Sequence, residues 1–155
     1  MKHFDQLIAG LCTLTGSSVP HQLATGDAIC FEGVNFAVAI NAHADPDALL
    51  LYADFGCLDR EKKAMLYPLM LKENFMMMGS RNGTFAVSER SDSVVLIECL
   101  SLSATTPDLL LARMRLLAHK ANYFNKQHRG LHHAAYRSRA HQSETLLSQR
   151  YAHGA

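Results

Sequence analysis

Residues 28–53 read AICFEGVNFAVAINAHADPDALLLYA, and this stretch decides the fold class. It contains three short apolar runs, at 28–31, 36–40 and 49–53, separated by turn-forming residues. The middle run alternates large and small side chains with the period of two that is typical of a strand. Because the connections are short, the three runs predict an antiparallel meander.

Helical and strand patterns on both sides of the meander predict the rest of the fold. Apolar residues at helical spacing indicate a first helix that ends near Gly16. A second helix follows the meander, and Pro68 inside it should kink or split it. The predicted elements are a helix at 4–14, the meander, a helix at 59–78, strands at 84–87 and 94–100, and a helix at 106–124. Their order, αβββαββα, indicates an α+β fold with a twisted antiparallel sheet.

Charge and periodicity divide the chain into a body, residues 1–126, and a basic, histidine-rich tail, residues 127–155. The body carries 11 Lys and Arg against 13 Asp and Glu, whereas the tail carries four basic residues and one acidic residue. The tail has no sustained apolar face, so we expect it to be mobile and dispensable for folding. Neither part is basic enough to indicate nucleic-acid binding.

The sequence predicts a protein of the cytoplasm. Its N-terminus lacks the pattern of a secretory signal, and no apolar run is long enough to cross a membrane. The four cysteines form no CxxC pair, and each has apolar neighbours in the sequence. They are therefore expected to be free thiols in a reducing compartment.

No motif in the sequence indicates catalysis, a metal or a cofactor. Phosphate-binding glycine loops, GxSxG and HExxH are all absent. His43 and Cys57 lack a third orienting group, and Asp45 and Asp47 fit a solvated turn. The histidines of the tail lack the fixed geometry that a metal site requires. We therefore expect no enzyme activity and no cofactor.

Two features predict a surface for a partner. Leu49 and Leu51 lie on one face of the third strand and Leu50 and Tyr52 on the other, so both faces of the sheet are apolar. Three helices can cover one face, and a second subunit or a bound chain would cover the other unless the helices of a monomer straddle both. The methionine-rich segment around residues 65–78 is either a gap-filling part of the core or an adaptable contact surface.

Four segments together resemble the class I type III secretion chaperones, the Tir-chaperone-like family. They are FDQLIAGL (4–11), FAVAI (36–40), LLYADFG (50–56) and MLYPLMLKENF (65–75). The last is similar to the leucine-rich family helix that ends in a Glu-Ala-Asn-like step, although here Lys72-Glu73 precede the asparagine. The resemblance covers about residues 1–126, and the near-neutral net charge departs from the acidic character of many members.

The resemblance implies a cytoplasmic bacterial homodimer that binds the N-terminal region of a secreted effector and keeps it extended and competent for secretion. In the family, the second helix and the following strand commonly form the dimer contact. Here this implies Leu69, Met70, Phe75, Met76, Phe85 and Val87. Effector contacts in the family come from the first helix and the first three strands. Here this implies Leu11, Leu14, Ile29, Phe31, Val38, Leu50 and Tyr52.

Two other functions are compatible with the same fold. One is a dimeric regulatory or adaptor protein that acts outside effector delivery. The other is a small-molecule binder or an enzyme, which would need convergent polar groups in a pocket. Identification of the bound partner would separate these alternatives from the chaperone.

Overall fold

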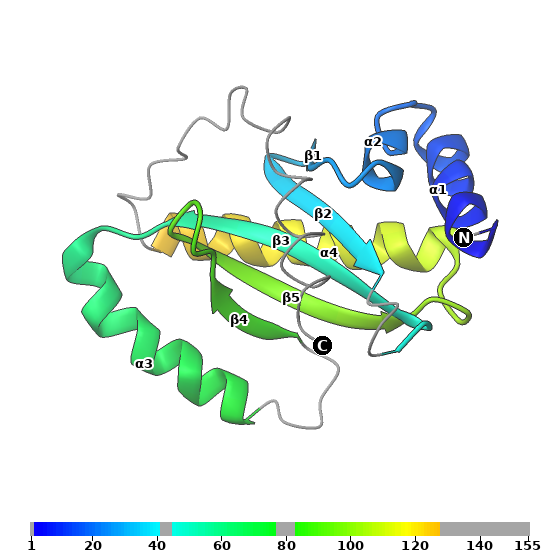
Figure 1. The fold of residues 1–155 in the computed structure, drawn as a ribbon. Coiled ribbons are helices and arrows are strands. Elements are labelled where there is room, and N and C mark those ends of the chain that lie inside the picture. Colours follow the sequence, from blue (N-terminus) through cyan, green and yellow to red (C-terminus); the bar gives the residue numbers. More distant parts are fainter. Residues whose placement is uncertain (1, 41–44, 77–82, 128–155) are drawn as a thin grey trace.

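The computed structural model describes residues 2–40, 45–76 and 83–127, which form one five-stranded sheet with helices packed on it (Figure 1). The helices are α1 (Lys2–Thr15), α2 (His21–Ala24), α3 (Arg60–Met76) and α4 (Pro107–Gln127). The strands are β1 (Ile29–Phe31), β2 (Val34–Ile40), β3 (Ala48–Cys57), β4 (Thr84–Val87) and β5 (Ser93–Ser101). The predicted α+β order is confirmed, with the short helix α2 added in a segment that the sequence did not predict to be helical.

The sheet is antiparallel throughout, with the strand order β1-β2-β3-β5-β4. The predicted meander forms its first three strands. Glu32 and Gly33 both have positive φ and make the tight two-residue turn between β1 and β2. β3 lies at the centre and contains a register shift between Asp54 and Gly56, where Gly56 has a φ of 86°.

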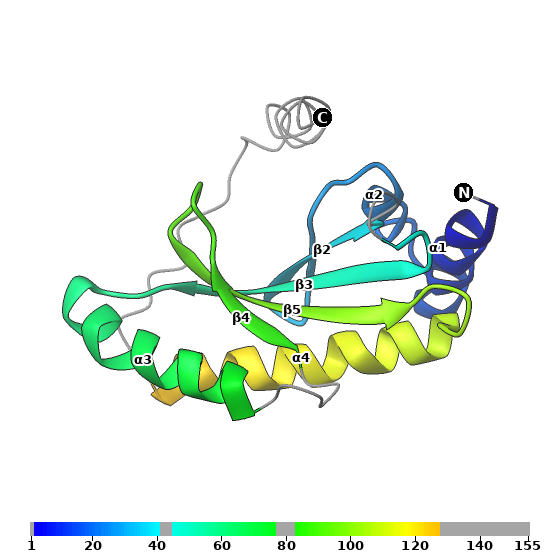
Figure 2. The same ribbon diagram turned by 60° about the horizontal axis from the view of Figure 1, so that its bottom comes forward.

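Helix α4 runs along one face of the sheet, with α1 packed against its first turns (Figure 2). Under it, Leu49, Leu51 and Ala53 of β3 are fully buried. Gly10 of α1 approaches α4 so closely that an added Cβ would lie 2.4 Å from a ring carbon of Pro107. Glycine is therefore required where the two helices meet.

A buried ion pair fixes α4 against β5. The carboxylate of Glu98 is only 1% exposed and points toward the helix. Arg113 binds it with both Nε, at 2.9 Å, and a terminal guanidinium nitrogen, at 2.6 Å. Such a two-point bond sets the position of the helix along the strand as well as neutralising the carboxylate.

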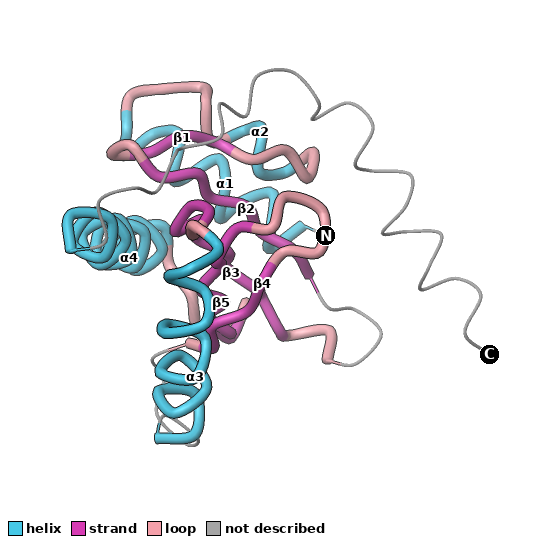
Figure 3. Tube along the Cα trace, turned by 90° about the vertical axis from the view of Figure 1, so that its left-hand side faces the viewer, coloured by secondary structure: helices cyan, strands magenta, loops and turns pink. Residues whose placement is uncertain are grey.

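Helix α3 lies beside β4, at the opposite end of the sheet from α1 (Figures 1 and 3). Of the two outcomes predicted for Pro68, a kink or a split, the split does not occur, because α3 is continuous from Arg60 to Met76. Pro68 lies on the exposed side, where water can reach the carbonyl of Ala64 that the proline leaves without an N–H donor.

Candidate binding surfaces

The sheet face opposite α4 carries a band of apolar side chains from the three central strands, here called the open face. The strand register places Tyr52 between Ala37 and Ile97, and Leu50 between Ala39 and Cys99. Each of these residues is half-buried or exposed in the single chain. A water-facing sheet surface would normally carry polar residues, so the open face is suited to a partner.

Helix α1 contributes one large exposed apolar side chain, Leu14, which is 45% exposed. Thr15 ends the helix, with its hydroxyl donating to the carbonyl oxygen of Leu11 at 2.9 Å. Gly16 then reverses the chain with a φ of 61°, as the sequence predicted for the stop. Leu14 therefore has a fixed position at the end of an ordered helix.

The structure divides the predicted partner-binding residues into two groups. Leu14, Leu50, Tyr52 and Phe31 are exposed or half-buried. Leu11, Ile29 and Val38 belong to the core of the single chain. Leu11 lies on the buried side of α1, and Ile29 and Val38 lie on the sheet face that α4 covers. The sequence pattern alone did not tell which apolar face the helices cover.

The outer side of α3 also carries large exposed apolar side chains, among charged ones. Leu66 and Met70 face the sheet, whereas Met65, Leu69, Leu71 and Phe75 point outward and are at least half exposed. Phe75 is the most accessible of them, at 75%. A helix with so much apolar surface in water is typical of a subunit contact.

The predicted dimer residues also fall into two groups. Leu69, Phe75 and Val87 are exposed in the single chain. Phe85 packs edge-on against Phe55, with ring centroids 5.6 Å apart, and Met70 is buried. The side chain of Met76 lies outside the described residues.

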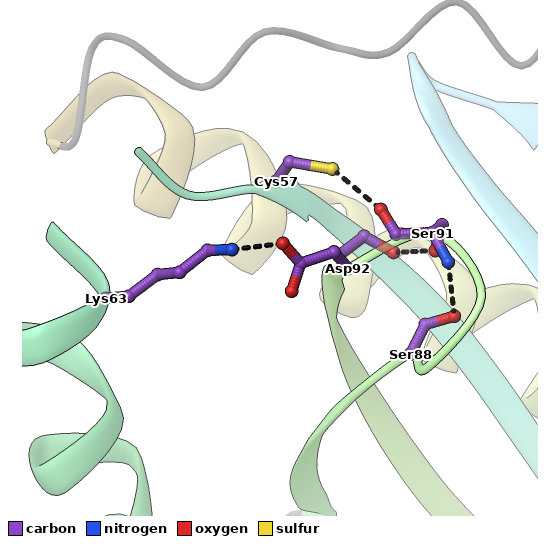
Figure 4. Close-up of polar contacts among 6 residues, drawn as sticks. Cys57, Lys63, Ser88, Ser91 and Asp92 are labelled. Carbon is purple, nitrogen blue, oxygen red and sulfur yellow. Dashed lines mark hydrogen bonds and ion pairs between the residues drawn. The ribbon is translucent and has the colours of Figure 1, made fainter. Parts of the chain in front are cut away.

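Polar contacts hold both ends of α3 to the β4–β5 hairpin. Near its start, Lys63 pairs with Asp92 of the hairpin turn, and this hydrogen bond raises the pKa of Lys63 (Figure 4). Near its end, the carboxamide of Asn74 binds the main chain of Phe85. Because so few residues of α3 are buried, these contacts contribute much of what orients the helix.

Cys57 lies next to the same hairpin at the end of β3. Its thiol donates to the carbonyl oxygen of Ser91 at 3.2 Å (Figure 4). Burial raises the pKa of the Cys57 thiol, and the nearby carboxylates of Asp54 and Asp92 raise it further. A thiol held in its protonated form is a poor nucleophile, so this site does not resemble a catalytic cysteine.

The described residues contain no group of three or more His, Cys, Asp and Glu side chains that could hold a metal ion. Asp45 and Asp47 form the predicted turn, in which the N–H of Asp47 donates to a carboxylate oxygen of Asp45 at 2.9 Å. His43 and the tail histidines lie outside the described part of the chain. In the same part, no helix is long and apolar enough to span a bilayer.

Comparison with known proteins identifies the family. Residues 7–125 match the model of the Tir chaperone protein (CesT) family. This range includes both apolar surfaces and ends just before the tail. No curated protein sequence is significantly similar to the chain.

Three solved structures share the fold. A chain of the ExsC-ExsE complex superposes with a TM-score of 0.54 at 18% identity, over 65% of this chain and 74% of that one. A chain of the HopA1-SchA chaperone-effector complex gives 0.59 at 11% identity, over 80% and 94%. The Yersinia pestis type III secretion chaperone SycH in complex with a YscM2 fragment gives 0.52 at 19% identity, over 76% and 96%. At these identities the likeness establishes the fold alone.

Proposed function

This chain belongs to the Tir chaperone protein (CesT) family of type III secretion chaperones, and we propose that it holds the N-terminal segment of a secreted effector extended in the bacterial cytoplasm. The observation that carries the proposal is the open face, where Leu50, Tyr52 and Ile97 form an accessible apolar band. Together with Leu14, this band would offer apolar contacts to alternate side chains of an extended segment.

The client would bind mainly by burying apolar surface. An unfolded segment loses conformational entropy when it becomes ordered, and a large wrapped surface offsets this loss. Apolar contacts and main-chain hydrogen bonds at a strand edge do not depend on one exact client sequence. This mode of binding suits a chaperone better than a single deep pocket would.

We propose that the chain acts as a homodimer. The outer side of α3, with Leu69 and Phe75, would meet the same surface of a second copy across a twofold axis. Val87 extends this surface onto β4. Such a contact would leave the open face of each copy available to the client, because α3 packs on the same side of the sheet as α4, with Leu66 and Met70 in the shared core (Figure 2).

No catalytic step is part of the proposal. The family is a chaperone family. The thiol of Cys57 donates its hydrogen bond to a main-chain carbonyl oxygen and not to a side chain that could act as a base. The alternative of an adaptor with the same fold differs from the chaperone only in the identity of its partner. Co-purification from the native host, followed by identification of the bound protein, separates the two.

Calorimetry with the identified client segment tests the binding surface. Leu14→Glu should weaken binding by about tenfold or more, because it places a charge in the apolar contact. The matched control is Leu116→Glu on α4, since Leu116 is 41% exposed and lies away from the open face. Wild-type binding should show a negative heat-capacity change. Equal affinity of both variants for the client would contradict the proposed surface. If the protein bound no client and turned over a small molecule, the proposal of a chaperone would give way to that of an enzyme.

A natural probe lies on the open face. Cys99 is exposed and stands opposite Leu50 in the strand register. Bound client should therefore slow the alkylation of Cys99, as measured by mass spectrometry after a short pulse of iodoacetamide. Unchanged labelling in a saturated complex would place the client elsewhere.

A further inference from the structure

The side chain of Asn74 binds both main-chain polar groups of Phe85. Its Nδ2 donates to the carbonyl oxygen of Phe85 at 2.9 Å, and its Oδ1 accepts from the N–H of Phe85 at 2.7 Å. In an antiparallel sheet, two residues on neighbouring strands exchange bonds in this way. The carboxamide of Asn74 thus takes the place that a residue of an added strand would occupy.

The hydrogen-bond pattern of β4 shows which of its residues face the outer edge. Beyond the end of the strand, the N–H of Ser88 donates to the carbonyl oxygen of Ser93 on the β5 side at 2.8 Å. Pairs that are hydrogen-bonded alternate with pairs that are not along an antiparallel ladder. Ala86 therefore faces β5, and Phe85 and Val87 turn their main-chain groups outward.

We propose that Asn74 seals the outer edge of β4 against the addition of another strand. An incoming strand would pair with Phe85 and Val87 in succession, and the carboxamide already occupies the first of them. An unprotected edge strand is a template for pairing with other extended chains. A protein that handles extended clients is particularly exposed to such pairing, and Asn74 prevents it on the side where α3 lies.

The opposite edge of the sheet has no such seal. Phe31 and Val34 flank the two-residue turn, so Cys30 turns its main-chain groups outward on β1. Within the described ranges, no side chain binds the main chain of Cys30. If the chain holds an extended client as proposed above, a client strand that joins the sheet therefore joins it at β1.

Hydrogen exchange measured by NMR tests the seal without any client, so its outcome is independent of the proposed function. Asn74→Leu should speed exchange of the Phe85 amide by about tenfold or more, while the amides of β5 keep their protection. The matched control is Asn122→Leu. Asn122 donates to the carbonyl oxygen of Glu32 at 3.1 Å, at the other edge of the sheet. An unchanged Phe85 exchange rate in Asn74→Leu would overturn the proposal.

Sedimentation velocity then tests whether the open edge recruits another strand. Asn74→Leu should form assemblies larger than those of the wild type and of Asn122→Leu. If the Phe85 amide exchanged fast in Asn74→Leu but the variant formed no larger assemblies, Asn74 would only hold α3 to β4 and would not block strand addition. That result would also overturn the proposal.

A second variant keeps the test decisive if Asn74→Leu fails to fold. In Asn74→Asp the carboxylate still accepts from the Phe85 N–H but cannot donate to its carbonyl, whereas the protonated acid can do both. The Phe85 amide should stay protected, and the loss of melting temperature relative to the wild type should shrink at acidic pH. Loss of Phe85 protection, or a melting-temperature loss that does not vary with pH, would contradict the role of the carboxamide.

Discussion

At the scale of single residues, Asp47 shows how one carboxylate joins two loops. It accepts a hydrogen bond from the hydroxyl of Ser101 at 2.6 Å and another from the N–H of Ser103 at 2.7 Å. These bonds hold the pKa of Asp47 below its usual range. They tie the turn before β3 to the turn before α4, so the start of β3 and the end of β5, which lie side by side, are fixed together.

This lowered pKa predicts a pH-dependent contribution to stability. A carboxyl group with a lowered pKa in the folded state stabilises the fold above its unfolded pKa, and the contribution is lost as the pH falls through the folded pKa. Asp47→Asn should therefore lower the melting temperature at neutral pH, with a difference from the wild type that shrinks toward acidic pH. Circular dichroism across the acidic range measures it, and a constant difference would argue against the bonds to Ser101 and Ser103.

The ion pair between Glu98 and Arg113 gives a larger expected effect. Arg113→Met leaves a carboxylate that is 1% exposed without its partner, which should destabilise the protein by about 3–5 kcal/mol. Replacing both residues with apolar ones, Glu98→Leu with Arg113→Met, should recover most of this loss. Urea unfolding of the wild type, the single variant and the double variant measures these differences in the free energy of unfolding. A cost under about 1 kcal/mol for Arg113→Met would show that the pair behaves as a surface salt bridge.

Single residues also mark where sequence reasoning reached its limit. The sequence placed Leu49 and Leu51 on one face and Leu50 and Tyr52 on the other, and the structure confirms this division. The sequence did not tell which face α4 covers, because both faces are apolar and the period of two is the same for either face. The family resemblance implies Ile29 and Val38 as partner contacts, and alternation gives no reason to exclude them, but in the single chain their side chains are in the core.

At the scale of elements, the strands and the longer helices followed from periodicity. The start of α4 was predicted from Thr106 and Pro107, and the hydroxyl of Thr106 accepts from the N–H of Leu109 at 3.2 Å. The interaction of Asn74 with β4 was not predicted, since it joins residues whose proximity depends on the tertiary fold. The helix α2 was missed because four residues are too few to show a period.

Helix α3 provides the test of the dimer. Phe75→Asp should yield a monomer with nearly unchanged unfolding, because the side chain is 75% exposed and carries little of the core. Equilibrium sedimentation at micromolar concentration measures the change. A wild-type protein that is already monomeric under these conditions would remove the basis for the proposed contact.

The control for that experiment is Met70→Asp on the sheet-facing side of the same helix. Met70 is 8% exposed, so a charge there should destabilise the fold by several kcal/mol rather than only separate two copies. The pair of variants thus distinguishes loss of a subunit contact from loss of the core. Equal unfolding profiles would contradict the orientation of α3.

At the scale of the whole molecule, we propose that residues 128–155 are dispensable for folding. The family match ends at residue 125 and the core draws on residues before it. A chain ending at Gln127 should keep the melting temperature of the full chain to within a few degrees, since the tail sequence has little apolar periodicity. A large drop measured by calorimetry would show that the tail packs on the body.

The length of β3 has a consequence for how the whole molecule handles two binding events. Its ten residues, at about 3.3 Å each, make a strut of about 33 Å between the end of the sheet near α1 and the start of α3. Because the client surface and the subunit contact share no residue and lie toward opposite ends of this strand, we expect client binding and dimerisation to have a coupling free energy near zero. A monomeric variant would then keep its intrinsic affinity for one segment. It would lose only the effective concentration that a paired copy provides to a client long enough to reach both.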